Sequence, residues 1–356
     1  MTKRENLISL LKRKGFEEAP VEFNLCPSLV EEYKNQTGSD LHYSEYFCMP
    51  WRNVDDILME VDLDAYRKYY SNGIKEGSLI DQWGIAHEPG SEAAKHMTHM
   101  IHPLSGIEDV EEIKKYPFLD FSKGDASNQK EQVESIHNQG LAAMGNMQMT
   151  IWETSWYLRS MEDLLVDMMS DDPIAAYILD KITEQAIIRA SSYAKAGVDI
   201  LFFGDDIGMQ HTILMSQELY QKWLKPRLKR VIDSVKSINP EIIVAYHSCG
   251  FIEPFIGDLI EVGVDVLNPV QSECMDFEEI YEKYGDKISF HGTIGTQTIM
   301  PFFTPEQVKE VVWRNLDLAG EKGGVFAAPT HMLEPEVPWE NIIAYVEACK
   351  TYKPKK

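Results

Sequence analysis

His247 and Cys249 are the residues of this chain best suited to bind a metal ion. They directly follow the apolar run 242–246, and His331 follows a second apolar run, 324–328. In extended backbone, residues two positions apart point to the same side, so His247 and Cys249 can share one ion. Imidazole and thiolate together suit zinc, and three protein ligands with an open fourth position are typical of catalytic zinc. We therefore predict a zinc site formed by His247, Cys249 and His331.

A simpler interpretation stays open for this pair. Cys249 can be a small buried hydrophobic residue, and His247 can be a core histidine whose hydrogen bonds are satisfied. His331, at an equivalent position after another strand, favours the metal site. Because His331 is far from Cys249 in the sequence, its pairing with them depends on the fold.

Short apolar runs alternate with longer amphipathic segments from about residue 140 onward. This alternation is typical of strand and helix units around a parallel sheet, and several helices end in a glycine that stops them before the next strand. We predict an α/β fold, a (β/α)8 TIM barrel, in one domain over residues 1–356. Residues 1–140 are expected to form an N-terminal helical or irregular extension and the first barrel elements. Six strands are expected at 141–145, 199–203, 242–246, 264–267, 288–291 and 324–328.

Three carboxylates follow expected strands, at the end where a TIM barrel carries its catalytic groups. Asp205 and Asp206 follow the strand at 199–203, and Glu153 follows the one at 141–145. Adjacent side chains seldom point into one site, so one aspartate is expected to face inward, where it could bind substrate, act as an acid or complete the zinc shell. We predict catalytic roles for Asp206, Glu153 and Asp205. The alternative for the two aspartates is a capping pair at a solvated strand end.

Polar and aromatic side chains near these strand ends are candidates for substrate binding. Two tryptophans and a tyrosine lie within residues 150–157, where their rings could line an apolar ligand site, although such residues more often pack in a core. We expect the substrate to contact Asn146, Trp152, Tyr246, Asn268, Gln271 and His291.

The composition limits the classes of ligand and partner. The chain has 356 residues, a formal net charge of -23 and 44% hydrophobic residues, which is typical of a globular protein. So negative a field repels nucleic acid and anionic membranes, and it favours a small neutral ligand or a protein partner. No window approaches the roughly 20 apolar residues of a membrane span. Five widely spaced cysteines favour a reducing compartment, so we expect a cytoplasmic protein.

The order of several motifs resembles that of the uroporphyrinogen decarboxylase superfamily, and within it the corrinoid-dependent methyltransferases more than the decarboxylases. The resemblance covers most of the chain and is strongest from Trp152 to the end. It is carried by Trp152-Glu153-Thr154-Ser155-Trp156-Tyr157, Phe203-Gly204-Asp205-Asp206, His247-Ser248-Cys249-Gly250, Asn268-Pro269-Val270-Gln271, His291-Gly292-Thr293 and Pro329-Thr330-His331.

The resemblance also bears on the metal ligands. In the zinc methyltransferases of this group, a His-x-Cys pair and a later Cys hold the metal; His247 and Cys249 match the pair, and His331 stands in place of the later Cys. A neutral imidazole instead of a thiolate makes the site less soft and less anionic, which favours an oxygen or nitrogen leaving group over a thiol. The Arg-rich N-terminal motif of true uroporphyrinogen decarboxylases is not found in residues 1–46.

The resemblance implies a corrinoid-dependent methyltransferase of the first step. Such an enzyme moves a methyl group from a small donor, for example a methoxylated aromatic compound, to a cobalt(I) corrinoid (cobalamin) carried by a partner protein. Zinc would activate the leaving group, and Asp206 or Glu153 would protonate it. The alternatives are a second-step enzyme that uses tetrahydrofolate or a thiol as acceptor, a decarboxylase, and a non-catalytic corrinoid-binding or metal-binding accessory protein. As an oligomeric state of this chain, we consider a homodimer.

Overall fold

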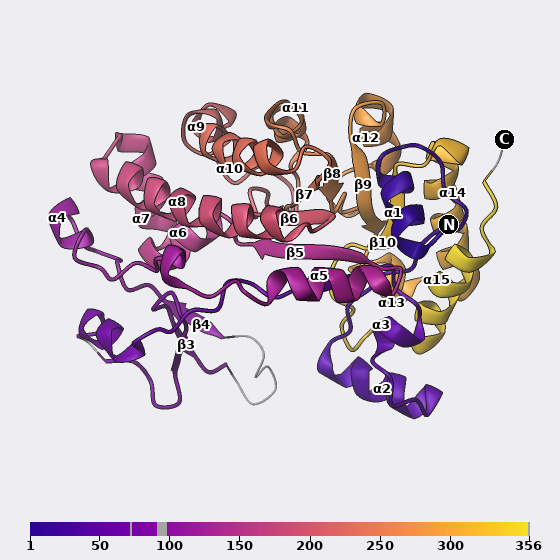
Figure 1. The fold of residues 1–356 in the computed structure, drawn as a ribbon, viewed down its shortest axis with the longest axis horizontal. Helices are drawn as coiled ribbons and strands as arrows, with labels where there is room; N and C mark the ends of the chain where they lie inside the picture. Colours follow the sequence, from indigo (N-terminus) through magenta and orange to yellow (C-terminus); the bar gives the residue numbers. More distant parts are fainter. Residues whose placement is uncertain (72, 91–97, 355–356) are drawn as a thin grey trace.

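The main sheet of the computed structural model contains seven strands, all parallel to their neighbours. The structure describes residues 1–71, 73–90 and 98–354 (Figure 1). The strands of this sheet lie side by side in the order in which they occur along the chain, which is the topology of a β/α barrel. The strands are β1 (Trp51–Val54), β5 (Ala142–Gln148), β6 (Ile200–Gly204), β7 (Ile243–His247), β8 (Val266–Asn268), β9 (Ser289–Ile294) and β10 (Val325–Pro329).

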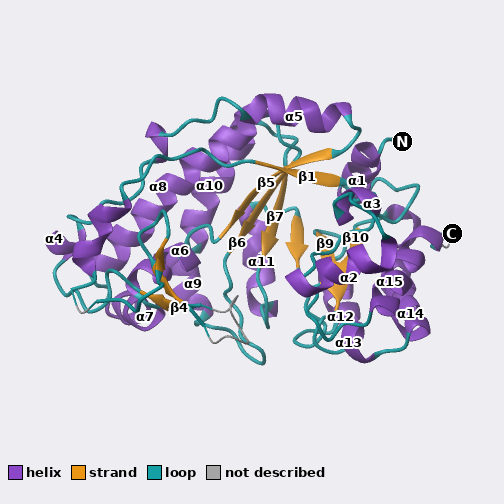
Figure 2. Cartoon of the chain, turned by 90° about the horizontal axis from the view of Figure 1, so that it is seen from below, coloured by secondary structure: helices purple, strands orange, loops and turns teal. Residues whose placement is uncertain are grey.

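Helices connect the strands and lie around the outer side of the sheet (Figure 2). Their ends carry the expected signals: Thr304 forms a capping box with Gln307, and Gly197 and Gly263 end helices in the left-handed conformation. The helices are α5 (Gln129–Asn138), α6 (Trp152–Arg159), α7 (Met161–Ser170), α8 (Pro173–Ala196), α9 (Gln217–Trp223), α10 (Lys225–Ile238), α11 (Glu253–Val262), α12 (Phe277–Tyr284), α13 (Ile299–Phe302), α14 (Pro305–Ala319), η4 (Gly320–Lys322) and α15 (Trp339–Thr351).

The N-terminal part combines short helices with a second, antiparallel sheet. In Figure 1, α2 and α3 lie below the main sheet at one end, and β3 and β4 lie below it at the other. The small sheet has the order β2-β3-β4. The elements are α1 (Lys3–Leu11), α2 (Pro27–Thr37), α3 (Tyr43–Tyr46), η1 (Leu63–Tyr69), β2 (Leu79–Ile80), β3 (Ala86–Glu88), β4 (His99–Ile101), α4 (Val110–Ile113) and η3 (Phe121–Lys123).

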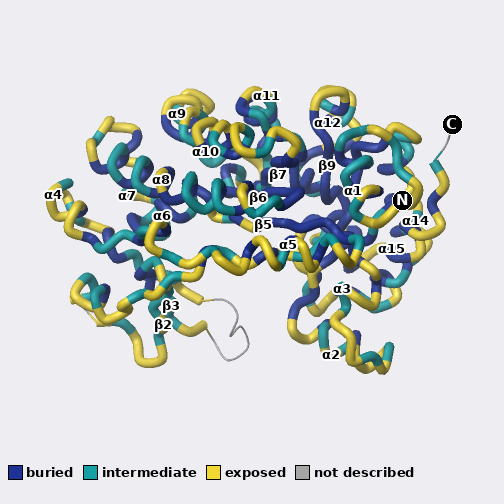
Figure 3. Tube along the Cα trace, in the orientation of Figure 1, coloured by how far each residue is buried: buried dark blue, intermediate teal, exposed yellow. Residues whose placement is uncertain are grey.

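Alternate residues of each main strand point to opposite faces of the sheet and build two cores. Leu201 and Phe203 of β6 belong to the large core that contacts the outer helices. Ile200 and Phe202 belong to a smaller core that includes Leu7 of α1. The strands are accordingly the most continuously buried part of the chain (Figure 3). The residues that share the face of Ile200 and Phe202 point to the inside of the curled sheet. Toward the carboxyl ends of the strands, polar residues replace apolar ones on this inner face.

The α/β class and the curled parallel sheet are confirmed, with one correction to the strand count. We expected eight barrel strands; among the described residues the main sheet has seven, and no pairing joins β1 to β10. The segment that contains Leu25 forms an isolated parallel bridge with Leu333, which lies in the loop after β10. Trp51 and Phe326 meet between the two edge strands, with ring centroids 5.3 Å apart.

The other expectations about the fold have different outcomes. All six expected strands are present, each starting one or two residues later than predicted. The small antiparallel sheet was missed because its strands of two or three residues are too short to show an alternating pattern. That residues 1–356 form one domain stays a prediction. Within the described residues, no helix combines the length and apolar character needed to cross a bilayer.

Candidate metal centre

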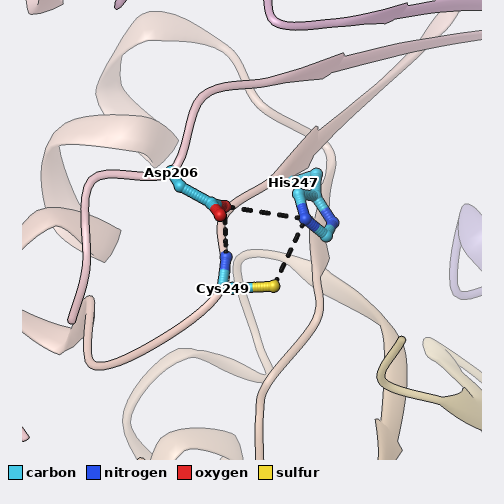
Figure 4. A group of neighbouring side chains, drawn as sticks. All are labelled: Asp206, His247 and Cys249. Carbon is cyan, nitrogen blue, oxygen red and sulfur yellow. Dashed lines mark hydrogen bonds and ion pairs between the residues drawn. The ribbon is translucent and has the colours of Figure 1, made fainter. Parts of the chain in front are cut away.

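Asp206, His247 and Cys249 form a compact group of potential metal ligands at the carboxyl ends of β6 and β7 (Figure 4). One ligand atom from each side chain lies within 4.8 Å of the other two. The Nε2 atom of His247 is 3.4 Å from the Sγ atom of Cys249 and 3.6 Å from Oδ1 of Asp206. The prediction that His247 and Cys249 share one site therefore agrees with their positions, and Asp206 is the aspartate that faces them.

The strand register and two glycines bring these side chains together. His247 is the last residue of β7 and pairs with Gly204 of β6. A Cβ atom at position 204 would lie 2.8 Å from the Cβ atom of His247 and 3.0 Å from its carbonyl oxygen, so glycine leaves room for His247 at this place. Gly250 adopts a φ of +82°, which turns the chain directly after Cys249, and its amide donates to Oε1 of Gln271 at 3.0 Å. Gln271 thus holds the turn.

The distances in this group fit a zinc ion. Two ligands of a tetrahedral zinc at ordinary bond lengths lie about 3.3 to 3.7 Å apart, and the two separations from Nε2 of His247, 3.4 and 3.6 Å, fall in that range. The donor set of one imidazole, one thiol and one carboxyl is also one that zinc accepts. His247, Cys249 and Asp206 would hold the ion and leave a fourth position open toward the cavity.

The protonation of the group favours metal binding by the imidazole. Burial lowers the pKa of His247, and the nearby Asp206 carboxylate offsets only part of that effect, so the ring is neutral near pH 7. Burial also raises the pKa of Cys249, and the charge of Asp206 adds to the rise. Cys249 is therefore a thiol when no ion is present, and binding of a metal would release its proton.

A cavity of about 780 Å³ lies next to this group. Seven of the residues predicted from the sequence line it, namely Asn146, Glu153, Asp206, His247, Asn268, His291 and His331. Cys249 does not line the cavity and reaches the group from beside His247. The site therefore has the place expected for a barrel enzyme, where the ligand enters from the carboxyl ends of the strands.

Glu153 has the most strongly shifted carboxyl in the cavity wall. Burial and then the charges of Asp205 and Asp206 raise the pKa of Glu153 to about 8, so the side chain carries a proton near neutral pH. Its Oε1 accepts a hydrogen bond from the hydroxyl of Tyr157 at 2.9 Å, and its Oε2 accepts one from the amide of Asp206 at 3.3 Å. These contacts fix the carboxyl beside the metal group.

Asp205, in contrast, has a structural position. Its side chain is buried and accepts hydrogen bonds from the amides of Ile151 and Glu153 at the start of α6. Burial raises the pKa of Asp205 to about 7. The carboxyl does not line the cavity. Asp205 thus caps the start of α6, as the alternative proposed, but its carboxyl is buried rather than solvated, and Asp206 does not share this role.

Three predicted substrate contacts also lie outside the cavity lining. Trp152 is fully buried in the outer core, and Tyr246 faces the same core because it stands between the inward-facing Ala245 and His247. Gln271 is buried behind the turn at Gly250. Because neighbouring residues of a strand point to opposite faces, a strict use of this rule would have placed Tyr246 outside the cavity once His247 was placed in it.

His331 lies at the same cavity but outside the compact group. It lines the same cavity as His247 and is exposed. Its ligand atoms are not among those within 4.8 Å of the group. Coordination by His331 stays a prediction.

Several polar residues of the cavity were missed from the sequence, and Glu22 and Arg52 are two of them. Glu22 lies on the segment before α2 and is buried, and its only signal is a charge between the apolar Val21 and Phe23. Arg52 of β1 is the single arginine or lysine among the described lining residues, and its Nη1 donates to the carbonyls of Met49 and Trp51. With Glu22, Glu45 and Asp206 also in the lining, the cavity disfavours a ligand with many carboxylates.

The solved structure of a methyltransferase from Methanosarcina mazei has the same overall fold. It matches with a TM-score of 0.69 and 18% identity, and the match covers 98% of each chain. At this identity the similarity concerns the fold alone.

The relatives that are similar in sequence are decarboxylases by name, not methyltransferases. The uroporphyrinogen decarboxylase of Hydrogenovibrio crunogenus is 22% identical over 194 residues, which cover 53% of this chain and 51% of the relative. The one of Christiangramia forsetii is 27% identical over 184 residues, which cover 51% and 50%. This chain thus spans about half the length of the curated relatives it matches. Residues 93–352, which contain every strand from β4 onward and the candidate metal centre, match the family described as Uroporphyrinogen decarboxylase (URO-D), and the chain therefore belongs to that family.

Proposed function

We propose that this protein is a metal-dependent methyltransferase of the first-step type. It would transfer a methyl group from a small donor, for example a methoxylated aromatic compound, to a cobalt(I) corrinoid carried by a partner protein. The observation that carries the proposal is the convergence of Asp206, His247 and Cys249 at a cavity at the strand ends. The barrel fold shared with the Methanosarcina mazei methyltransferase is compatible with this assignment.

The residues of the cavity suit the binding of such a donor. Aromatic and thioether side chains in the lining, Phe23, Tyr43, Trp51, Met144 and Phe202, provide apolar surface for a flat ring. Asn146 and Asn268 add amide groups that can orient a polar substituent. The donor would thus lie with its leaving atom toward the group of Asp206, His247 and Cys249.

The chemical difficulty is the leaving group, because a phenolate or amide departs poorly without help. Zinc, when bound, would supply Lewis-acid stabilisation of the negative charge that develops there. Glu153 would hold a proton on its carboxyl and donate it to the departing atom. Tyr157 would keep that carboxyl in place through its 2.9 Å hydrogen bond.

Metal content and methyl transfer test the proposal together. We expect about one zinc per chain in protein purified under reducing, metal-replete conditions, and loss of zinc in the C249A and H247A variants. Methoxylated aromatic donors should then methylate added cobalt(I) cobalamin, which is followed by its absorption spectrum. Zinc-free wild-type protein, or full activity in C249A, would contradict the metal-dependent mechanism.

The H331A variant separates the two candidate ligand sets. Loss of zinc in H331A would support the three ligands predicted from the sequence, and retention would support Asp206 as the third ligand. A methyl-transfer activity that runs only from methylcobalamin to tetrahydrofolate or a thiol would assign the second-step reaction instead. Zinc or corrinoid binding without either transfer would indicate an accessory protein.

Decarboxylation is the second candidate, because the family and both sequence relatives carry that name. The acidic cavity and the net charge of -23 make a polycarboxylate substrate unfavourable. Incubation with uroporphyrinogen decides between them: release of carbon dioxide at a rate that C249A does not change would favour the decarboxylase.

A further inference from the structure

A chain of hydrogen bonds runs from the candidate metal centre to the far wall of the cavity. The Nδ1 atom of His247 lies 2.6 Å from Oδ1 of Asn268. The Nδ2 atom of Asn268 lies 2.9 Å from Nδ1 of His291 and 2.9 Å from the carbonyl oxygen of His291. The Nε2 atom of His291 lies 3.2 Å from Oε2 of Glu22. The members come from β7, β8, β9 and the segment before α2.

The carbonyl oxygen of His291 fixes the direction of every bond in this chain. A carbonyl only accepts, so the amide of Asn268 must point its NH₂ group toward β9 and its oxygen toward β7. The Asn268 oxygen can only accept from the Nδ1 of His247, which must therefore carry the proton. The second hydrogen of the Asn268 NH₂ group meets Nδ1 of His291, so His291 carries its proton on Nε2 and donates it to Glu22.

We infer that Asn268 is a positioning residue that holds His247 in the Nδ1-protonated tautomer and leaves Nε2 free to bind the metal. The Nε2 atom is the one that faces Cys249 and Asp206, at 3.4 and 3.6 Å. Metal-binding histidines depend on such a partner at their second nitrogen, which orients the ring and increases its basicity. Neither Asn268 nor His291 belongs to the compact ligand group itself.

Glu22 and the surrounding rings make this chain rigid. Asn268, His291 and Glu22 line the cavity but are largely buried, so a misplaced member would leave its neighbours without the hydrogen-bond partner that they have in the folded chain. Glu22 is held in turn by Asn24, which donates to its Oε1 at 3.4 Å, and by the hydroxyl of Tyr345 at its backbone. The His291 ring packs against Phe326 and Trp51, with centroids 4.7 and 5.0 Å away. Glu22 thereby links the N-terminal segment to the metal centre.

The carboxylate end of the chain also has an electronic effect. The acceptance of a hydrogen bond by Glu22 makes Nδ1 of His291 a better acceptor for Asn268, and Asn268 in turn a better acceptor for His247. The effect falls with distance along the chain. Removal of Asn268 should therefore weaken metal binding more than neutralisation of Glu22.

The tautomer of His247 can be measured without metal or activity. In protein with ¹⁵N-labelled histidine, the nitrogen chemical shifts distinguish protonated from unprotonated ring nitrogens, and the H247Q variant assigns the signals. We expect His247 to be protonated on Nδ1 in the wild type and to shift toward the Nε2-protonated tautomer, which free neutral histidine favours, in N268A. Protonation of His247 on Nε2 in the wild type would overturn the inference.

Zinc affinity, measured by competition with a chelator, is the second readout, and it rests on the proposed function. We expect N268A to bind zinc about 10- to 100-fold more weakly than the wild type, and E22Q to show a smaller loss. N315A is the matched control. It also removes a buried side-chain amide, which donates to the carbonyl of Thr293 near the end of β9. We expect N315A to destabilise the fold without changing the zinc affinity.

The outcomes separate this inference from the proposed function. Zinc binding that is equal in N268A and the wild type, with an unchanged His247 tautomer, would overturn the inference while the methyltransferase proposal stands. A wild type that binds no zinc but has the Nδ1-protonated His247, lost in N268A, would contradict the proposed function and support the positioning role of Asn268.

Discussion

The carboxylate of Asp206 accepts a hydrogen bond of 2.8 Å from the backbone amide of Cys249. This contact joins the loop after β6 to the loop after β7. It keeps the thiol of Cys249 near His247 before any metal arrives. Asp206 therefore both organises the site and offers a ligand to it.

The D206N variant separates these two roles. Asparagine keeps an oxygen that can accept from the Cys249 amide, so the free energy of unfolding should change by less than about 1 kcal/mol. It loses the negative charge of the carboxylate, which attracts the zinc ion, so zinc affinity should fall about 100-fold or more, beyond the loss typical of residues outside the ligand shell. Chelator competition and urea denaturation measure the two quantities. Unchanged zinc affinity would exclude Asp206 as a ligand.

The E153Q variant tests the proposed proton donor. Glutamine is similar in size and can accept from Tyr157, but it has no carboxyl proton to donate. We expect the rate of methyl transfer to fall about 10²- to 10⁴-fold, with zinc content unchanged. Steady-state kinetics with a methoxylated donor and elemental analysis provide the readouts. A rate close to that of the wild type would mean that the leaving group takes its proton from elsewhere.

Gly204 should be essential for the geometry of the metal centre. In the G204A variant the new methyl group would lie 2.8 Å from the Cβ atom of His247 and 3.0 Å from its carbonyl oxygen. We expect a loss of about 1–3 kcal/mol in the free energy of unfolding and weaker zinc binding, because His247 must move.

Gly257 offers a matched control for this substitution. It lies in α11, and a Cβ atom there would have no neighbour within 4 Å. The G257A variant should be as stable as the wild type or more stable by about 0.5–1 kcal/mol, because alanine favours the helix. Equal zinc affinity in G204A and G257A would contradict the steric role of Gly204.

Asp258 should make the stability of the barrel sensitive to acid. Burial raises its pKa, but hydrogen bonds from Lys225, Gln221 and Gln217 outweigh burial and lower the pKa of Asp258 below its ordinary value of 3.8. A carboxyl with a lowered pKa in the folded state stabilises the protein above its ordinary pKa, and this contribution is lost as the pH falls through the lowered value. The three partners lie on α9 and α10, so the carboxylate ties those helices to α11.

Urea denaturation of D258N at several pH values measures this contribution. We expect D258N to be about 1–3 kcal/mol less stable than the wild type from pH 8 to pH 5, and the difference to shrink below about pH 4. D233N is the control, because Asp233 is exposed and pairs with Lys229 within its own helix. A difference that persists unchanged at low pH would contradict the role of the ionised carboxylate.

The sequence by itself determined the class of fold, the strands that carry the site and the central pair of ligands. Buried runs such as 242–246 are long enough to predict strands, and the spacing of His247 and Cys249 right after one of them predicts that the two residues share a site. Helix stops at Gly197 and Gly263 mark the repeating units. These signals are local, so they can be read without coordinates.

The tertiary structure decided which distant residues join that pair and which strand-end residues face away from it. The sequence could not tell which of the two adjacent aspartates faces the site. In the folded chain, where β6 pairs with β7, Asp206 faces His247 and Asp205 faces the start of α6. Glu22 reaches His291 across 269 positions of sequence, a contact that no local pattern encodes. Alternation decides the face of a residue within a strand, but contacts between loops and between distant segments depend on how all the strands curl, and only the folded chain contains that information.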